Sequence, residues 1–268
     1  MSLDTLAMGL MAARDAATRL PLPTSTHPGF SLADAYAVAD HIRRRRIARG
    51  ERPCGYKIGF TNRSIWPKYG VFAPIWAPVW DSTLTLLDGI ETRLSLAGLV
   101  QPRLEPEIVF TFARSPKAGM SEGELTACIE SVAHGFEVVH MHFDDWRFQA
   151  PDTVADFALH GRLLVGPRVA VNAYTDLSSE LAALRLQLFR GDEALDEGRG
   201  NVVLDGPLNA LRLWVDSMAA QAQRWPINAG DVVTTGTITD AWPLSAGQRW
   251  QTRLSDARLP GLTLSVEA

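Results

Sequence analysis

The sequence predicts an α+β protein, in which an N-terminal helical region packs on one β-rich domain. The first 50 residues carry amphipathic, helix-like patterns, whereas the rest of the chain carries short β-branched apolar runs separated by turn residues. The chain has 268 residues, of which 46% are hydrophobic and 21% charged, so it is long enough for a large core. We therefore expect a helical cap over residues 1–50 and a β-rich domain over residues 51–268, together forming one structural unit.

Two helices are expected before residue 50, with the loop PLPTSTHPG between them. The second helix should begin at Ser31, because Asp34 follows three residues later as in a capping box. This helix contains the basic run RRRR at residues 43–46. The turns of the helix before this run carry an apolar stripe. We interpret this run as a solvated helix face or a subunit contact.

Strands are expected in the rest of the chain, at 55–60, 107–113, 136–143, 162–166 and 184–190. The last of these should turn back as a hairpin at RGDEALDEG, and the C-terminal tail returns to strands. Two helices should interrupt the strands. One covers residues 121–135, with Ser121 as its first cap and Gly135 as its stop, and the other starts at Pro207.

The charge and cysteine content exclude several classes of protein. The net charge of -4 argues against a general nucleic-acid-binding surface. Two cysteines are too few for a disulfide framework. The N-terminus lacks the layout of a signal peptide and no apolar run is long enough to span a membrane, so we expect a cytoplasmic protein.

Two carboxylates share one face of the strand expected at LEPEIVF. Side chains two positions apart in a strand point to the same side, so Glu105 and Glu107 flank Pro106 on one face. One interpretation is a solvent-exposed edge strand that Pro106 keeps from pairing. The other is a site for Mg²⁺ or Mn²⁺, because oxygen ligands suit these cations. A third acid, Glu137, begins the next apolar strand, and an intervening helix would bring it beside the pair, which favours the metal site.

Lys57 and Asp81 are two further charged residues in apolar surroundings. Lys57 either faces solvent or is held near a metal-bound anion, where it polarises a carbonyl or transfers protons with a lowered pKa. Asp81 is a lone acid in APVWDSTL. His140 and His142 share a strand face, and we expect packing or subunit contacts for them.

Five segments occur in the order and spacing of a known family: GYKIGFTN, LEPEIVF, FEVV through DTVADFALHG, GPLNALRLWV and AGDVVTTGTITDAWPLSAGQ. Together they resemble the 2-keto-4-pentenoate hydratase / 4-oxalocrotonate decarboxylase family, within the fumarylacetoacetase C-terminal-domain superfamily. The resemblance runs from about residue 30 to the C-terminus. It implies a mixed β-roll or β-sandwich core of the fumarylacetoacetase C-terminal type, a homo-oligomer, and a small 2-oxo or 2-hydroxydienoate acid as substrate.

The resemblance also implies roles for particular residues. Glu105, Glu107 and Glu137 match the family's ligands for Mg²⁺ or Mn²⁺, and Lys57 matches its active-site lysine. The metal would hold the carboxylate and 2-oxo oxygens of the substrate and stabilise an enolate. Lys57 would stabilise or shuttle protons, and Asp81 would orient or activate water.

One segment departs from the family pattern. Members usually read VADNASSG, whereas this chain reads VADFALHG, with Phe157 in place of the asparagine and His160 in place of the serine. Because histidine titrates near neutrality, His160 would serve as a general base or reshape the pocket. Residues 62–80 would form the family's lid, although this segment is rich in tryptophan.

The expected function is that of a lyase: a metal-dependent hydratase that adds water to a 2-hydroxy-2,4-dienoate to give a 4-hydroxy-2-oxo acid, as in aromatic compound catabolism. A 4-oxalocrotonate-type decarboxylase is one alternative. An acylpyruvate or β-diketone C–C hydrolase is another, and an added base at His160 makes it more plausible. The last is an inactive paralogue acting as an assembly partner, against which the retained glutamates and Lys57 argue. We expect no nucleic-acid or membrane partner.

Overall fold

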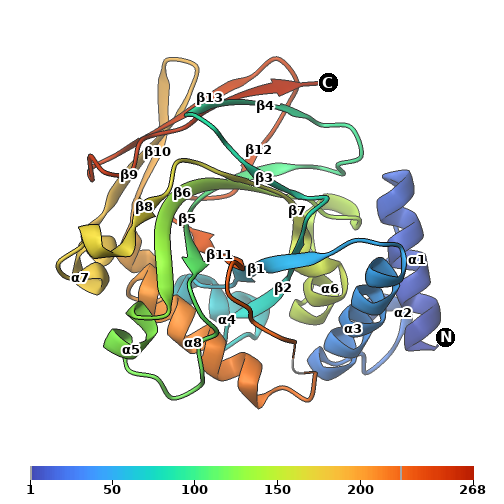
Figure 1. The fold of residues 1–268 in the computed structure, drawn as a ribbon. Helices are drawn as coiled ribbons and strands as arrows, with labels where there is room; N and C mark the ends of the chain where they lie inside the picture. Colours follow the sequence, from blue (N-terminus) through green and yellow to red (C-terminus); the bar gives the residue numbers. More distant parts are fainter. Residues whose placement is uncertain (1, 224) are drawn as a thin grey trace.

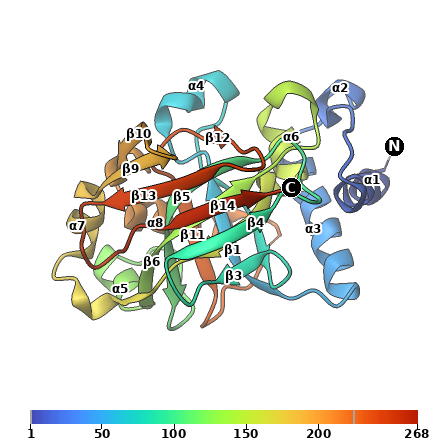
Figure 2. The same ribbon diagram turned by 90° about the horizontal axis from the view of Figure 1, so that it is seen from above.

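The computed structural model describes residues 2–223 and 225–268. Within these residues, the strands form a mixed nine-stranded sheet that curls strongly and a five-stranded sheet that lies over one side of it (Figure 1). The α+β class predicted from the sequence is confirmed. Figure 2 shows the five-stranded sheet from above, with α1 and α3 beside the sheets at the N-terminal side of the molecule.

The nine-stranded sheet carries the residues of interest. Its main path runs β2 (Ile75–Trp80), β1 (Pro53–Gly59), β11 (Val232–Thr237), β5 (Arg103–Phe112), β6 (Ile129–Val139), β7 (His160–Val165) and β3 (Leu84–Leu86). The short strands β12 (Trp242–Pro243) and β8 (Val169–Ala170) pair with β5 and β6.

The five-stranded sheet follows the order β10 (Glu193–Arg199), β9 (Arg185–Arg190), β13 (Arg249–Leu254), β14 (Thr263–Glu267) and β4 (Glu91–Ser95). The predicted hairpin is confirmed, because β9 and β10 pair antiparallel across the turn at Gly191.

Helices cover the outside of the curled sheet. They are α1 (Leu3–Ala16), α2 (Pro23–Thr26), α3 (Leu32–Ala48), α4 (Trp66–Tyr69), α5 (Glu122–Thr126), α6 (Ala150–Ala155), α7 (Leu177–Ala183) and α8 (Pro207–Ala220). Single-turn 3₁₀ helices are η1 (Arg63–Ile65), η2 (Asp144–Trp146), η3 (Phe157–Leu159), η4 (Val171–Ala173) and η5 (Gly200–Val202). No described helix is long and apolar enough to cross a membrane.

The N-terminal helices begin where the sequence indicates. Ser31 caps α3 as expected, because its hydroxyl accepts from the Asp34 N–H at 3.2 Å and the Asp34 carboxylate accepts from the Ser31 N–H at 2.9 Å. Buried side chains of α1 and α3, including Leu10 and Ile42, belong to the same apolar cluster as the sheet residues Ile58 and Phe110. The division of the chain at residue 50 stays a prediction.

The helix predicted over residues 121–135 begins at the Ser121 cap as expected, but its predicted length and its end at Gly135 are wrong. A helix forms only over Glu122–Thr126, and β6 begins at Ile129. Strand β6 is buried on both faces between β5 and β7, so its apolar run lacks the alternation of a half-exposed strand and cannot be told from a buried helix. Gly135 lies within β6 and does not end a helix. A glycine suits this position because a Cβ there would lie 2.9 Å from the carbonyl oxygen of Leu164.

The last six residues of the predicted lid, residues 75–80 of the range 62–80, belong to the core. Residues 75–80 form β2, in which every residue is buried, and Trp76 and Trp80 are 2% exposed. The tryptophans therefore serve packing. Residues 63–69 form η1 and α4 on the surface.

Candidate metal centre and active site

The three predicted ligands converge in the middle of the curled sheet. Strands β5 and β6 pair antiparallel with Glu105 opposite Glu137, and Glu107 lies two residues further along the same face. Carboxylate oxygens of the three residues lie within 4.8 Å of one another, as oxygen ligands of one cation would. Strand β5 has neighbours on both sides, β11 and β6, so the edge-strand interpretation of LEPEIVF is wrong.

Pro106 is accommodated at an irregularity of the sheet. The pairing of β11 with β5 shifts register between Thr234, opposite Val109, and Thr237, opposite Glu107, so the regular ladder is already interrupted before Pro106. A proline lacks the N–H that a regular central strand needs, and a bulge removes that need. The carbonyl of Pro106 still accepts from the Ile238 N–H at 3.0 Å.

Glu107 is held from β11. Its Oε2 accepts from the Thr234 hydroxyl and, at 2.6 Å, from the Gly236 N–H. Gly236 has φ +105°, and a Cβ there would lie 1.8 Å from the Thr61 hydroxyl oxygen, so glycine is required for this approach. The other oxygen, Oε1, is buried without a hydrogen-bond partner among the described residues.

Glu137 is oriented by two neighbours. His160 Nδ1 lies 2.8 Å from Glu137 Oε1, and Lys57 Nζ lies 3.1 Å from Glu137 Oε2. A carboxylate only accepts, so Nδ1 carries the proton and Nε2, at 2.9 Å, accepts from the Thr83 hydroxyl. Burial lowers the pKa of His160 to about 4, against the opposing influence of Glu137, so the imidazole is neutral.

The carboxylates influence one another's protonation. Burial and the charges of its neighbours Glu137 and Glu105 raise the pKa of Glu107 well above its ordinary value. Burial also raises the pKa of Glu105. For Glu137 burial acts in the same direction, but the charge of Lys57 and the hydrogen bond from His160 outweigh it and leave the pKa lowered. The charge of a divalent cation would relieve the repulsion among the three.

Lys57 is 4% exposed, so the solvent-facing interpretation is wrong. It lies in the middle of β1, and its Nζ also donates to the Ala158 carbonyl at 3.0 Å. Burial lowers the pKa of Lys57, but the negative charges of Glu137, Glu105 and Glu107 outweigh it, so the pKa is raised. We expected a lowered pKa; the structure instead favours a permanent ammonium.

An unusual turn brings these groups together. Phe157, Ala158 and Leu159 have φ of 57°, 46° and 65°, the left-handed region that residues other than glycine rarely adopt. This turn aims the Ala158 carbonyl at Lys57 and then starts β7 at His160. Such backbone costs on the order of 1–3 kcal/mol per residue and persists only when its surroundings fix it.

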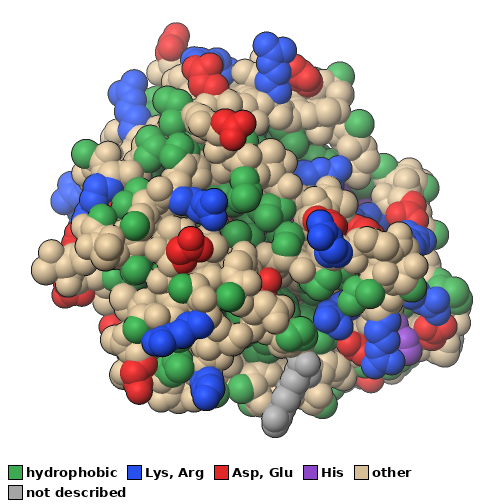
Figure 3. Space-filling view, in the orientation of Figure 1, with side chains coloured by type: hydrophobic (Ala, Val, Ile, Leu, Met, Phe, Trp, Pro, Cys, Tyr) green, Lys and Arg blue, Asp and Glu red, His purple; other side chains and the backbone are tan. Residues whose placement is uncertain are grey.

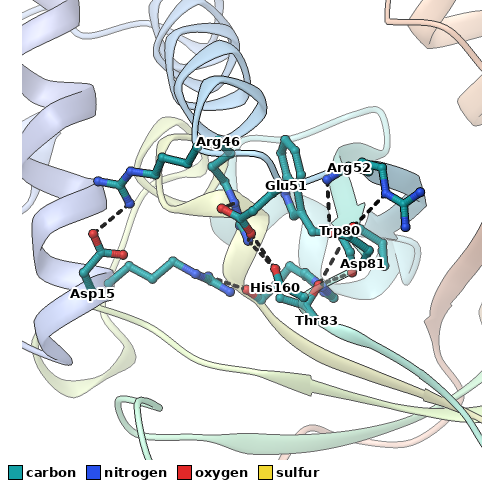
Figure 4. Close-up of polar contacts among 12 residues, drawn as sticks. Asp15, Arg46, Glu51, Arg52, Trp80, Asp81, Thr83 and His160 are labelled. Carbon is teal, nitrogen blue, oxygen red and sulfur yellow. Dashed lines mark hydrogen bonds and ion pairs between the residues drawn. The ribbon is translucent and has the colours of Figure 1, made fainter.

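The structure corrects the roles predicted for His160 and Asp81. His160 is 1% exposed, contacts Glu137 and does not line the cavity described below, so its place favours orienting Glu137 over acting as a base in that cavity. Asp81 lies on an exposed turn after β2, where its carboxylate accepts from the Arg52 N–H and side chain at 3.0 Å (Figure 4). A match to a sequence motif gives the position of Asp81 along the chain but not the direction of its side chain, which the turn after β2 points toward solvent.

A cavity of about 440 Å³ opens onto the centre, with Lys57 and Glu105 at its inner end. Three aromatic rings that contact one another form part of its wall: Phe60, Tyr69 and Phe148, with Tyr69 and Phe148 stacked at 4.8 Å. Lys68 and Tyr69 of α4 line the cavity, so the surface part of the predicted lid borders it.

Sequence reasoning missed several residues of this site. Thr234 and Gly236 stand in GDVVTTGT, a segment noted for its resemblance but given no role. Arg103 immediately precedes LEPEIVF and lines the cavity, with its guanidinium 4.2 Å from the ring centre of Trp146. Of the other acids noted in the sequence, Asp145 lines the cavity, whereas Asp156 is buried and bonded to His142 at 2.6 Å.

Comparison with known proteins identifies the family. No protein-family model matches the chain. The chain is 34% identical over 241 residues to the 2-hydroxyhexa-2,4-dienoate hydratase of Comamonas testosteroni, a match that covers 89% of this chain and 88% of that protein. This chain belongs to the 2-keto-4-pentenoate hydratase / 4-oxalocrotonate decarboxylase family. The resemblance inferred from the five segments is thereby confirmed.

Both branches of this hydratase/decarboxylase family are represented among the relatives. The 2-keto-4-pentenoate hydratase 1 of Dechloromonas aromatica (strain RCB) is 30% identical over 81% of this chain and 79% of its own length. The 4-oxalocrotonate decarboxylase of Pseudomonas sp. (strain CF600) is 30% identical over 85% of this chain and 83% of its own length. The sequence comparisons thus support a lyase and leave the branch open.

Solved structures agree with the fold. The 4-oxalocrotonate decarboxylase from Pseudomonas putida G7, complexed with magnesium and adipate, superposes with a TM-score of 0.89 at 26% identity over 98% of this chain and 97% of that one. The fumarylpyruvate hydrolase from Pseudomonas aeruginosa, in complex with Mn²⁺ and pyruvate, has a TM-score of 0.61 at 12% identity over 81% of this chain and 89% of that one, which shows the shared fold alone. The predicted fumarylacetoacetase-type core is confirmed.

Proposed function

We propose that the protein is a divalent-metal-dependent hydratase that converts a 2-hydroxy-2,4-dienoate into a 4-hydroxy-2-oxo acid. The observation that carries this proposal is the cluster of three carboxylates, of which Glu107 and Glu137 are fully buried, beside the Lys57 ammonium at a cavity lined by both charged and apolar side chains. The named hydratase relatives support the same reaction class. Overall, the enol hydroxyl loses its proton, C3 and C5 each gain one, and the hydroxyl group of a water molecule joins C4.

The donor set fits Mg²⁺ or Mn²⁺. All three ligands are carboxylates, and Glu107 Oε1 points at no protein donor among the described residues, which leaves it available to a cation. When bound, the ion would act as a Lewis acid toward the carboxylate and 2-oxo oxygens of the substrate. The magnesium complex of the structurally similar decarboxylase supports this choice of ion.

The chain's own residues would hold and orient the substrate. Lys57, fixed by Glu137 and the Ala158 carbonyl, presents an ammonium that stabilises negative charge developing on the 2-oxygen. The aromatic wall excludes water from the diene and packs against its tail. Asp145 and Asp240 line the cavity, and we propose that one of them orients the attacking water in place of Asp81.

A decarboxylase is the second candidate, because a specific observation favours it. Arg103 and Lys68 line the same cavity, and a cation there suits the distal carboxylate of a 4-oxalocrotonate-type substrate. The C–C hydrolase stays an alternative, but it gains no added support from His160, which does not line this cavity. A homo-oligomer in the cytoplasm stays a prediction for either branch.

The test supplies purified protein and Mg²⁺ with 2-hydroxypenta-2,4-dienoate or, separately, with 2-hydroxymuconate. Loss of dienol absorbance with formation of the 4-hydroxy-2-oxo acid from the first substrate supports the hydratase. Release of CO₂ from the second, without hydration of the first, identifies the decarboxylase. Absence of turnover with both would contradict an enzyme of this family and favour the inactive paralogue.

A pair of lysine variants tests the site itself. Lys57→Met should lower kcat by about 10²–10⁴-fold, the range typical for an electrostatic or proton-transfer group. Lys117→Met, which removes an exposed lysine, is the matched control and should keep full activity. Equal activity of the two variants would contradict the proposed role of Lys57.

A further inference from the structure

A second cavity, of about 290 Å³, lies between α1, α3 and the start of β7, and it shares no lining residue with the cavity of the metal centre. We call it the arginine pocket. Its charged lining consists of four arginines and two acids: Arg14, Arg46, Arg49, Arg162, Asp15 and Glu51. The wall therefore carries two more positive charges than negative ones.

Arg46 is the member of the basic run 43–46 that does not face solvent. Its side chain is 6% exposed, and its guanidinium lies 4.4 Å from the ring centre of Trp80. Glu51 accepts from Nε at 2.9 Å and also from Nη2, as Figure 4 shows. Nη1 is buried and has no hydrogen-bond partner among the described residues. A buried donor without an acceptor costs about 1–3 kcal/mol, so this nitrogen needs a partner.

Arg14 and Arg162 have no carboxylate partner among the described residues. Arg14 donates to the carbonyls of His160 at 2.8 Å and Gly161 at 3.4 Å, and Arg162 donates to the same Gly161 carbonyl at 2.9 Å. Burial lowers the pKa of Arg14 to about 9, and the charges of Arg46 and Arg162 act in the same direction. Two guanidinium groups thus meet at one neutral oxygen.

The remaining pair closes one side of the pocket. Arg49 and Asp15 form an ion pair at 2.8 Å that joins α3 to α1, with both side chains about half exposed. The opposite charges of Arg49 and Asp15 cancel. The remaining charges of the lining are the guanidinium groups of Arg14, Arg46 and Arg162 and the single carboxylate of Glu51. Partly buried like charges repel, and an anion between them would convert that repulsion into attraction.

We propose that the arginine pocket binds a small oxyanion, such as inorganic phosphate, between the guanidinium groups of Arg14, Arg46 and Arg162. Guanidinium forks match the oxygens of phosphate in paired hydrogen bonds. The volume is large enough for such an ion together with water, whereas the metal centre without its cation presents carboxylates that repel anions. A carboxylate from a second copy of the chain is a different occupant, and the experiment below separates the two.

The test is a titration of metal-free protein, dialysed to remove chelator, with inorganic phosphate at constant ionic strength set by chloride. Isothermal calorimetry should show one saturable site per chain. Arg162→Gln, which removes a partly exposed guanidinium that holds no acid, should weaken phosphate binding at least tenfold. Arg162→Lys, which keeps the charge, should recover part of that loss.

Two controls keep the result interpretable. Arg103→Gln removes an arginine from the other cavity and should leave the phosphate affinity unchanged. Circular dichroism should show that all variants keep the native fold, and sedimentation velocity reports their oligomeric state. Unsaturable binding, equal affinity of wild type and Arg162→Gln, or a loss confined to Arg103→Gln would overturn the proposal. The proposal is also overturned if the wild type binds no phosphate and Arg162→Gln changes the oligomeric state. That result would indicate a carboxylate from a second copy of the chain in the pocket.

Discussion

Removal of divalent cations should destabilise the protein measurably, because the metal centre gathers uncompensated negative charge in the core. The side chains of Glu107 and Glu137 have no exposed surface, and the Lys57 ammonium contacts Glu137. Three carboxylates and one ammonium leave two negative charges without a partner, which is the charge that one divalent cation neutralises. Folding without the cation must therefore bury repelling groups or protonate them.

The size of the effect follows from binding linkage. A ligand that binds only the native state stabilises it by about 2.7 kcal/mol at a free concentration of 100 Kd. For a chain of 150–250 residues, each kcal/mol shifts Tm by about 2–4 °C. Addition of Mg²⁺ or Mn²⁺ to the metal-free protein should therefore raise Tm by ~5–11 °C, and calorimetric unfolding with and without the ion measures this rise.

Glutamate variants assign the shift to the centre. Glu107→Gln removes one ligand and some of the repulsion, so its metal-free Tm should not fall, while its gain from the cation should shrink strongly. Glu130→Gln, which changes an exposed acid on the neighbouring strand β6, should keep the whole shift. If wild type gains nothing from either ion, or if Glu107→Gln gains as much as wild type, the assignment of these carboxylates as metal ligands is refuted.

Three further predictions concern neighbouring positions. Asp81→Asn should leave kcat and KM within about twofold of wild type, because the side chain lies on an exposed turn; a large loss in steady-state kinetics would return Asp81 to the site. His160→Leu should weaken metal affinity by about 10–100-fold, as loss of a ligand-orienting group does, and saturating metal should rescue kcat. A kcat that stays low at saturating metal would instead indicate a direct chemical role. Gly236→Ala should lower the free energy of unfolding by about 3 kcal/mol or more, since its φ is +105° and the new Cβ meets the Thr61 side chain; urea unfolding at wild-type stability would contradict this.

The sequence predicted the carboxylate cluster because two of its acidic residues stand close together along the chain, at the spacing of a strand. The pair Glu105 and Glu107 shares a face because a strand alternates, and Glu137 follows in the next strand, so the cluster of three carboxylates could be named in advance. The helix predicted between them was wrong, yet the ligands still met, because an antiparallel hairpin brings the strands together more directly than a helical crossover would.

Other features depend on contacts between distant segments. Two strands, β11 and β5, separate the strand of Lys57 from the strand of Glu137 in the sheet order, and the two residues meet because the sheet curls. The basic run 43–46 gave no sign that Arg46 alone would be buried, since that depends on Trp80 and Glu51. The left-handed turn has no glycine to reveal it. The face in Figure 3 shows acidic and basic side chains intermixed, consistent with the small net charge.

The left-handed turn at residues 157–159 also limits how this site can be transferred to another protein. A designer who copies three glutamates and a lysine onto a new sheet would copy the ligands without the carbonyl that restrains the lysine. That carbonyl exists because three consecutive side-chain-bearing residues adopt a conformation that none prefers. A graft that works must therefore carry residues 156–160 as a unit, together with the packing that holds Phe157 and His160 in place.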